Sequence, residues 1–106
     1  LTGKYSDGAS APEGSRKSIN DGLGGRITPR LWPAIDAYLA LADEYNLDLG
    51  QMALAWCLRR PFMASVIFGA TSLPQMENSL KASELTLSDE IMARIDETHK
   101  SHPMPF

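Results

Sequence analysis

One segment limits the folds open to this chain more than any other. Residues 63–68, MASVIF, are apolar apart from one serine and form the only convincing candidate for a β-strand. Uniform apolarity is typical of a strand covered on both faces. A single strand leaves both edges without backbone hydrogen-bond partners, so it cannot make a sheet alone. The chain is therefore either a helical cluster or one section of a parallel α/β fold. We favour the second interpretation, because it also accounts for a first residue, Leu1, that is not methionine.

Most of the remaining sequence predicts helices, each with its own start or stop signal. Apolar residues recur at helical spacing in the first of them, and Asn46 can end it in a left-handed conformation. Asp48 and Ser72 each precede a glutamine by three residues, which is the spacing of a capping box. Ser88 precedes two acidic residues that favour a helix start. The predicted helices span residues 30–45, 49–60, 73–83 and 89–100.

The charge distribution and the cysteine count exclude several classes of function. Residues 1–30 carry five basic and three acidic side chains, whereas the rest carries five basic and ten acidic ones. This division argues against a nucleic-acid surface and is compatible with a local anion site. No apolar run reaches the roughly 20 residues of a membrane helix, so we expect neither a nucleic-acid nor a membrane partner. The lone Cys57 excludes an internal disulfide and fits a cytoplasmic protein. The glycine-rich residues 6–29 predict a long loop without helix or strand.

The turn between the strand candidate and the next helix has the composition of an anion site. Gly69 follows the strand directly, and glycine lets a ligand approach the backbone closely. Thr71 or Ser72 begins the helix, where free N–H groups and the helix dipole favour negative charge. Gln75 adds a neutral donor one turn later. These residues alone leave two interpretations open: a phosphate site, or an ordinary helix cap, which is the commoner use of such a turn.

Three separated motifs resemble the aldo-keto reductase family. The string IFGATSLPQMENSLKA, residues 67–82, resembles the segment after the eighth strand of that family, with its pattern G-A-[ST]-x-x-x-Q-[LM]. LTGKY, residues 1–5, is similar to the stretch after the seventh strand, and LGQMALAWCLRRP, residues 49–61, is similar to the helix between these landmarks. The nearest branch resembles bacterial reductases related to potassium-channel β subunits. The chain is thus identified as a member of this family and corresponds to roughly its last third.

The resemblance implies a fold class and a division of the chain. The family folds as a (β/α)8 TIM barrel of about 250 residues. We therefore expect an α/β chain that forms the C-terminal segment of a TIM barrel, mostly helical with one clear strand near 63–68. Residues 1–106 would then be the C-terminal part of the barrel, with 1–29 as the cofactor loop region and 30–106 as the helices, the last barrel strand and the C-terminal helix. The exposed strand would let the chain self-associate.

The resemblance also implies a binding site for NADP(H). Lys4 resembles the family's lysine near the pyrophosphate, and Arg16 resembles an arginine that faces the adenosine 2′-phosphate. The family often places Glu-Asn three and four positions after the glutamine of the turn, where this chain has Asn78 and Ser79, so its own Glu77-Asn78 pair is displaced by one residue. The expected cofactor-binding residues are Lys4, Arg16, Gly69, Ala70, Thr71, Ser72, Gln75, Asn78 and Ser79.

The function implied is that of an NADPH-dependent aldo-keto reductase, which in its full length passes a hydride to an aldehyde or ketone substrate. The family's catalytic Asp, Tyr, Lys and His precede this portion, and none can be placed here. We therefore expect no catalytic residue, no metal site and no activity of the fragment alone, and we interpret His99 and His102 as surface residues. The alternatives are a regulatory, NADP(H)-sensing β-subunit-like barrel and a free-standing helical interaction module.

Overall fold

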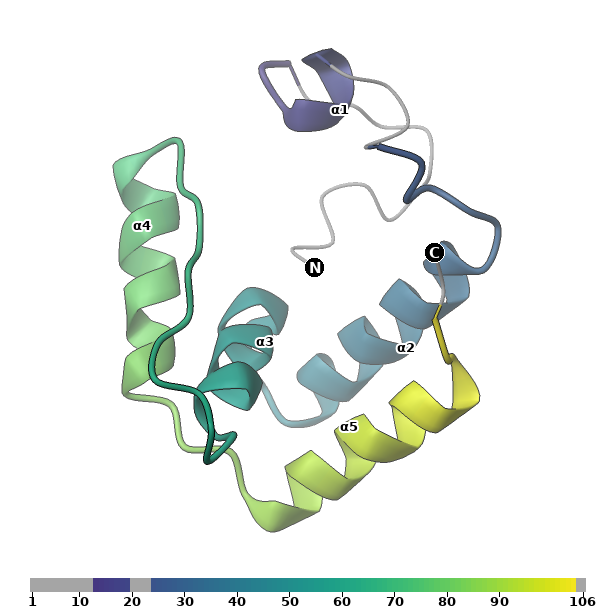
Figure 1. The fold of residues 1–106 in the computed structure, drawn as a ribbon, viewed down its shortest axis with the longest axis vertical. Coiled ribbons are helices and arrows are strands. Elements are labelled where there is room, and N and C mark those ends of the chain that lie inside the picture. Colours follow the sequence, from purple (N-terminus) through teal and green to yellow (C-terminus); the bar gives the residue numbers. More distant parts are fainter. Residues whose placement is uncertain (1–12, 20–23, 105–106) are drawn as a thin grey trace.

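The fold is helical throughout the part of the chain that the structure describes. The structure is a computed structural model that describes residues 13–19 and 24–104. Figure 1 shows α2 and α5 as two long helices that run alongside each other, with α3 beside them and α4 at the edge of the molecule. The elements are α1 (Arg16–Ile19), α2 (Leu31–Glu44), α3 (Leu49–Leu58), α4 (Leu73–Leu80), the 3-10 helix η1 (Lys81–Ser83) and α5 (Asp89–Ser101).

The local start signals in the sequence are confirmed as helix caps. The Asp48 carboxylate accepts a hydrogen bond from the backbone N–H of Gln51 at 2.9 Å. The Ser72 and Ser88 hydroxyls accept equivalent bonds at the starts of α4 and α5, at 3.4 and 3.2 Å. Asn46 has a φ of 52°, the left-handed conformation expected after α2. All four predicted helices are therefore present, with the third one ending as η1.

The prediction that residues 6–29 contain no helix is wrong at α1. Arg16 to Ile19 form a single helical turn. The Ser15 carbonyl accepts hydrogen bonds from the backbone N–H groups of Ser18 and Ile19 at 3.0 and 3.2 Å, and also from the Ser18 hydroxyl at 2.7 Å. Serine side chains can satisfy backbone groups in this way, so one turn forms without help from an apolar face.

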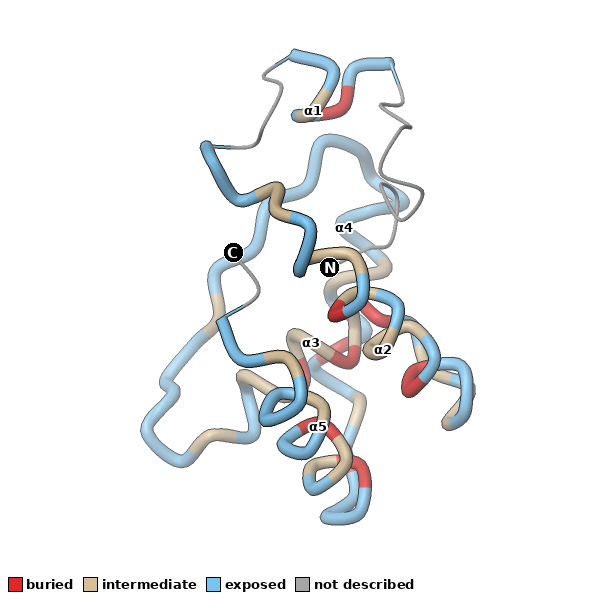
Figure 2. Tube along the Cα trace, turned by 90° about the vertical axis from the view of Figure 1, so that its right-hand side faces the viewer, coloured by how far each residue is buried: buried red, intermediate tan, exposed pale blue. Residues whose placement is uncertain are grey.

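The hydrophobic core lies where α2, α3 and α5 meet. Figure 2 shows the buried positions gathered on the facing sides of these helices. Met52 and Leu87 are the largest side chains that are almost wholly buried, at 2% and 1% exposed. Ala82 of η1 is equally buried, and η1 packs on α3. The core cluster consists of Leu41, Ala42, Leu49, Met52, Ala55, Leu87, Ile91 and Ile95.

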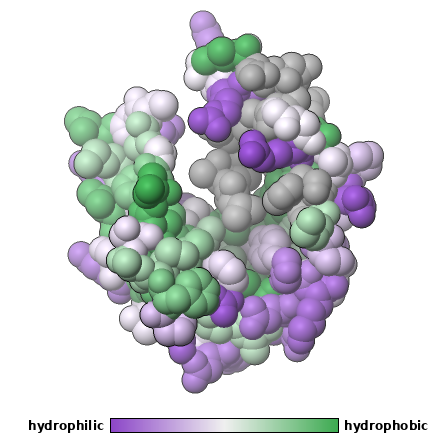
Figure 3. Space-filling view, viewed as in Figure 1, coloured by the Kyte–Doolittle hydropathy of each residue, from purple (hydrophilic) through white to green (hydrophobic). Residues whose placement is uncertain are grey.

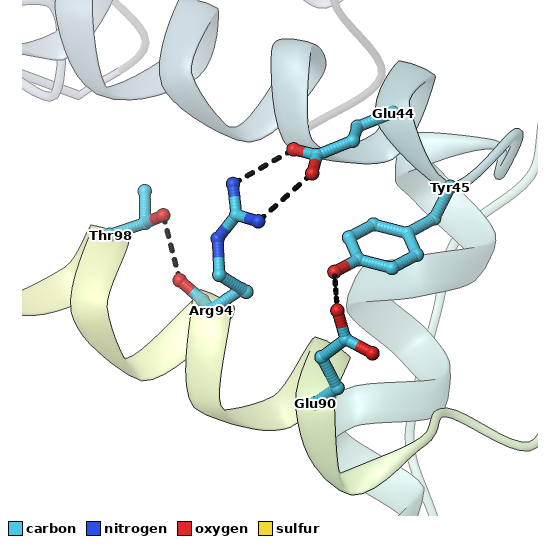
Figure 4. Close-up of polar contacts among 5 residues, drawn as sticks. All are labelled: Glu44, Tyr45, Glu90, Arg94 and Thr98. Carbon is cyan, nitrogen blue, oxygen red and sulfur yellow. Dashed lines mark hydrogen bonds and ion pairs between the residues drawn. The ribbon is translucent and has the colours of Figure 1, made fainter.

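Polar contacts join the C-terminal end of α2 to α5 (Figure 4). Both guanidinium Nη atoms of Arg94 donate to the Glu44 carboxylate, at 2.9 and 2.8 Å, and this pairing lowers the pKa of Glu44. The Tyr45 hydroxyl donates to Glu90 at 2.8 Å, which raises the pKa of the tyrosine. The Thr98 hydroxyl donates to the carbonyl of Arg94 at 2.9 Å. The C-terminal end of α2 is thus fixed to α5.

The predicted strand near 63–68, and with it the α/β barrel-segment class, is wrong for the residues described. Residues 65–70 run without regular secondary structure, and no strand occurs within 13–19 and 24–104. Ile67 is 97% exposed, so the segment is not covered on both faces. A strand requires a neighbour for its backbone N–H and C=O groups, and the described chain offers no second strand. The described part of the chain therefore folds as the other arrangement considered above, a helical cluster.

An uncovered apolar surface results from this arrangement. Figure 3 shows hydrophobic residues gathered over α4 and the segment that leads to it, at the left of the view. We call residues 58–80 the 58–80 surface. Its exposed large hydrophobic residues are Leu58, Phe62, Met63, Ile67, Phe68, Leu73, Met76 and Leu80.

None of the helices within residues 13–19 and 24–104 is long and apolar enough to cross a membrane.

Candidate functional site

The turn that leads into α4 is closed by its own side chains. The Gln75 side-chain oxygen accepts hydrogen bonds from the backbone N–H and from the hydroxyl of Thr71, both at 3.0 Å. The Ser72 hydroxyl accepts from the backbone N–H of Gln75 at 3.4 Å. Ser72 is therefore the N-cap, and Gln75 reaches back over the turn. The phosphate-site and helix-cap interpretations of the sequence both rested on Thr71, Ser72 and Gln75. The structure shows how these residues form the cap.

At the N-cap and the first residue of α4, two backbone donors remain after capping. In the described part of the chain, no hydrogen bond is made by the backbone N–H groups of Ser72 and Leu73, and Pro74 has no N–H to offer. A Cβ built on Gly69 would have no other atom within 4 Å. The turn thus presents two N–H groups at a helix N-terminus, next to open space over the glycine. Such groups favour an anion or a hydrogen-bond acceptor.

Asn78 and Ser79 lie farther along α4 and face α3. The Gln51 side-chain amide donates to the Asn78 side-chain oxygen at 2.7 Å, in a half-buried contact. Ser79 lines a hollow of about 270 Å3 together with Leu54 and Leu80. Asn78 keeps its own amide N–H2 as a donor. The sequence placed Gln51 in a capping box, in which its side chain would reach back to the backbone N–H of Asp48. In the structure that side chain donates to Asn78 instead, and no local pattern signals a contact between two helices.

The two basic residues expected at the cofactor site are not joined to this turn. Lys4 lies outside the described residues. Arg16 begins α1, is exposed, and makes no hydrogen bond or ion pair within the described chain. Figure 1 shows α1 well separated from α4. The structure therefore brings together the expected residues Gly69 to Gln75, places Asn78 and Ser79 on the α3 side of the same helix, and leaves Arg16 apart.

The described residues provide no metal centre. Residues 13–19 and 24–104 contain no group of three or more His, Cys, Asp or Glu side chains that could hold a metal ion. His99 is exposed and His102 is half-buried, and both line a groove between α2, α3 and α5. The chemistry available at the α4 turn is therefore binding through N–H groups and neutral side chains.

Comparison with known proteins agrees with the three sequence motifs. The model of the aldo/keto reductase family matches residues 1–100. "Protein tas" of Escherichia coli K12 is 35% identical over 105 residues, which cover 99% of this chain and 30% of that protein. "Putative voltage-gated potassium channel subunit beta" of Schizosaccharomyces pombe is 36% identical over 111 residues, covering 98% of this chain and 32% of that protein. "L-glyceraldehyde 3-phosphate reductase" of Escherichia coli O157:H7 is 32% identical over 103 residues, which cover 92% of this chain and 29% of that protein.

These matches extend over nearly all of this sequence but over only part of each relative. The chain spans about a third of the length of the curated relatives it matches. The family match includes the α3 helix and the α4 turn described above. The chain therefore belongs to the aldo/keto reductase family.

Proposed function

We propose that this chain is the NADP(H)-binding portion of an oxidoreductase that reduces aldehydes or ketones by hydride transfer. Membership of the aldo/keto reductase family supports the oxidoreductase class, and one relative is named as a reductase of a phosphorylated aldehyde. Bound NADPH would supply the hydride, while this chain would contribute to holding the coenzyme. No catalytic residue is assigned to the chain, so we expect the 106 residues alone to reduce no carbonyl compound.

The observation that carries this proposal is the pair of free N–H groups at the α4 turn. The donors of Ser72 and Leu73 lie at a helix N-terminus, and the space over Gly69 is open. An adenosine 2′-phosphate is a strong acceptor that such a turn can bind. Thr71 and Gln75 already bond to each other, so their contribution is to hold the turn in shape. Arg16 would add positive charge only if α1 moved toward the turn in the bound state.

Replacing Gly69 by alanine tests the turn directly. The added methyl group meets no atom within 4 Å and Gly69 does not have a positive φ, so the fold should tolerate it. A ligand lying against the backbone would be displaced. We expect about tenfold weaker NADPH binding, equivalent to one charge-assisted hydrogen bond, with a thermal melt that is slightly raised, since alanine restricts the unfolded chain more than glycine does. Unaltered NADPH affinity in a fluorescence titration would leave the turn as a helix cap only.

Replacing Arg16 by alanine tests the preference for the phosphorylated coenzyme. Loss of a charge-assisted contact should weaken NADPH binding by roughly tenfold to a hundredfold. NADH lacks the 2′-phosphate and should bind almost as before. Arg30→Ala is the matched control, because Arg30 is another exposed arginine without a side-chain capping bond. Equal losses of affinity for NADPH and NADH would mean that Arg16 only orders its loop. A wild-type chain that shows no saturable NADPH binding would contradict the proposal as a whole.

A regulatory, NADP(H)-sensing subunit is the second candidate function. It is favoured by the relative named as a potassium channel β subunit, which matches almost all of this chain. Both candidates require the same coenzyme site, so coenzyme binding does not separate them. Steady-state turnover of simple aldehydes, measured in a protein of the relatives' full length that contains this sequence, does: turnover supports the reductase, and tight NADPH binding without turnover supports the sensor.

A further inference from the structure

The α4 helix is anchored in the core at one end only. No residue of α4 itself is buried, and only Asn78 and Ser79 are half-buried. The helix continues into η1, where Ala82 is 2% exposed and the chain packs on α3. At the other end lies the turn with the free N–H groups of Ser72 and Leu73, where every side chain is exposed. Packing therefore fixes the η1 end of α4 but not the end that carries the turn.

One hydrogen bond holds α4 against α3 between these two ends. The Gln51 side-chain amide donates to the Asn78 side-chain oxygen at 2.7 Å, and in the described part of the chain no other hydrogen bond joins α3 to α4. Gln51 is itself well fixed, because the Asp48 carboxylate accepts from its backbone N–H at 2.9 Å and its neighbour Met52 is 2% exposed in the core. A tilt of α4 about η1 grows toward the turn, which begins about 9 Å of helix before Asn78, at 1.5 Å per residue. The contact therefore limits how far the turn can move from α3.

We propose that Gln51 is a positioning residue for the coenzyme, and that its contact with Asn78 holds the free N–H groups of the α4 turn where they meet the phosphate. This inference rests on the proposed function, since the turn is the coenzyme site proposed above. Gln51 acts through Asn78 and contacts no coenzyme atom itself. A turn that is already in place loses less free energy to ordering on binding, and the affinity of a protein falls by the fraction of it that is competent to bind. Loss of the contact should therefore weaken binding although every group at the turn is kept.

Replacing Gln51 by methionine removes the donor and keeps the length of the side chain. NADPH affinity in a fluorescence titration should fall about fivefold, the shift that one hydrogen bond of ordinary net strength imposes on a two-state equilibrium. NADH should lose less affinity, because it lacks the 2′-phosphate. Tyr45→Phe is the matched control, since it removes a 2.8 Å hydrogen bond to Glu90 of α5, away from α4, and it should bind NADPH as the wild type does. Both variants are compared at a temperature at which circular dichroism shows them fully folded, where lost stability alone changes no affinity. Unchanged NADPH affinity in Gln51→Met, or an equal loss in Tyr45→Phe, would overturn the inference.

A double variant separates positioning from a direct contact between Asn78 and the coenzyme. Asn78→Leu alone should weaken NADPH binding about as much as Gln51→Met. Combining the two replaces both polar partners by apolar ones of similar size, a change that can be nearly neutral, so the double variant should recover most of the affinity. A double variant that binds no better than either single one would overturn the positioning role.

Hydrogen exchange measures the hold on the turn without any coenzyme. The backbone N–H of Met76 donates to the carbonyl of Ser72 at 3.1 Å, and that of Met92 donates to the carbonyl of Ser88 in α5 at 3.0 Å. A turn released from α3 opens locally more often, so the Met76 amide should exchange faster in Gln51→Met while the Met92 amide does not. Equal exchange of Met76 in variant and wild type would overturn the inference and leave the proposed function standing. Faster exchange in a chain that binds no NADPH would instead overturn the proposed function and show that Gln51 only holds the turn.

Discussion

Replacing Leu87 by alanine should cost this chain more stability than the same change at an exposed leucine. Leu87 is 1% exposed and belongs to the core cluster, between η1 and α5. Truncation to alanine removes three carbons, about 2.4 kcal/mol of transfer free energy at ~0.8 kcal/mol each. A cavity term adds to this, so we expect a decrease of about 2.5–4 kcal/mol in the free energy of unfolding. Leu73 is 73% exposed, so its truncation should cost about a quarter of the transfer term, ~0.6 kcal/mol.

Urea unfolding followed by far-ultraviolet circular dichroism measures both changes. The midpoint should fall strongly for Leu87→Ala and slightly for Leu73→Ala, with the slope m unchanged, because neither substitution alters the surface exposed on unfolding by much. Equal shifts of the two midpoints would refute the reasoning. They would mean that the interior of α2, α3 and α5 does not carry the stability of the fold.

Three further outcomes are expected from individual contacts. The hydrogen bond from Arg94 lowers the pKa of Glu44 in the folded chain. The stability that this pair adds is therefore complete above the ordinary pKa of a glutamate and is lost as the pH falls through the lowered pKa of folded Glu44. Glu44→Gln should accordingly flatten the acid side of a plot of melting temperature against pH. We propose that the chain self-associates through the 58–80 surface. Ile67 is 97% exposed on that surface, so Ile67→Lys should shift the sedimentation coefficients measured by analytical ultracentrifugation toward the monomer. An unchanged distribution of sedimentation coefficients would contradict this proposal. Gln51→Ala leaves Asn78 without its 2.7 Å contact and should cost about 1 kcal/mol in thermal unfolding, whereas no change would show the contact to be neutral.

Helices were predictable here because their signals are local. Asp48, Ser72 and Ser88 each bond to a backbone N–H three residues later, and such a contact is encoded within one turn of sequence. Asn46 marks the end of α2 for the same reason, since its left-handed conformation depends mainly on its own side chain. The single turn of α1 was missed because it has neither an apolar face nor a capping box.

The strand prediction failed because a strand depends on residues elsewhere. The apolar composition of residues 63–68 indicates a segment suited to burial, but burial and pairing need neighbours that the described chain does not supply. The contact of Gln51 with Asn78 and the groove beside Trp56 were also unpredictable, since both form only when helices far apart in sequence meet. Of the expected coenzyme site, the sequence located the turn, while the position of Arg16 relative to it depends on the path of the chain.

Gly69 is where the two interpretations of the α4 turn lead to different expectations for coenzyme binding. A glycine is required by backbone geometry where φ is positive, yet Gly69 is not among the positive-φ residues, and a Cβ there meets nothing within 4 Å. If the turn is only a cap, Gly69→Ala should stabilise the chain by about 0.4–1 kcal/mol through the unfolded state and change nothing else. If the turn binds the coenzyme, the same variant should melt higher and bind NADPH less tightly. A melt and a titration on one protein sample therefore distinguish a glycine kept for a ligand from one that the fold does not need.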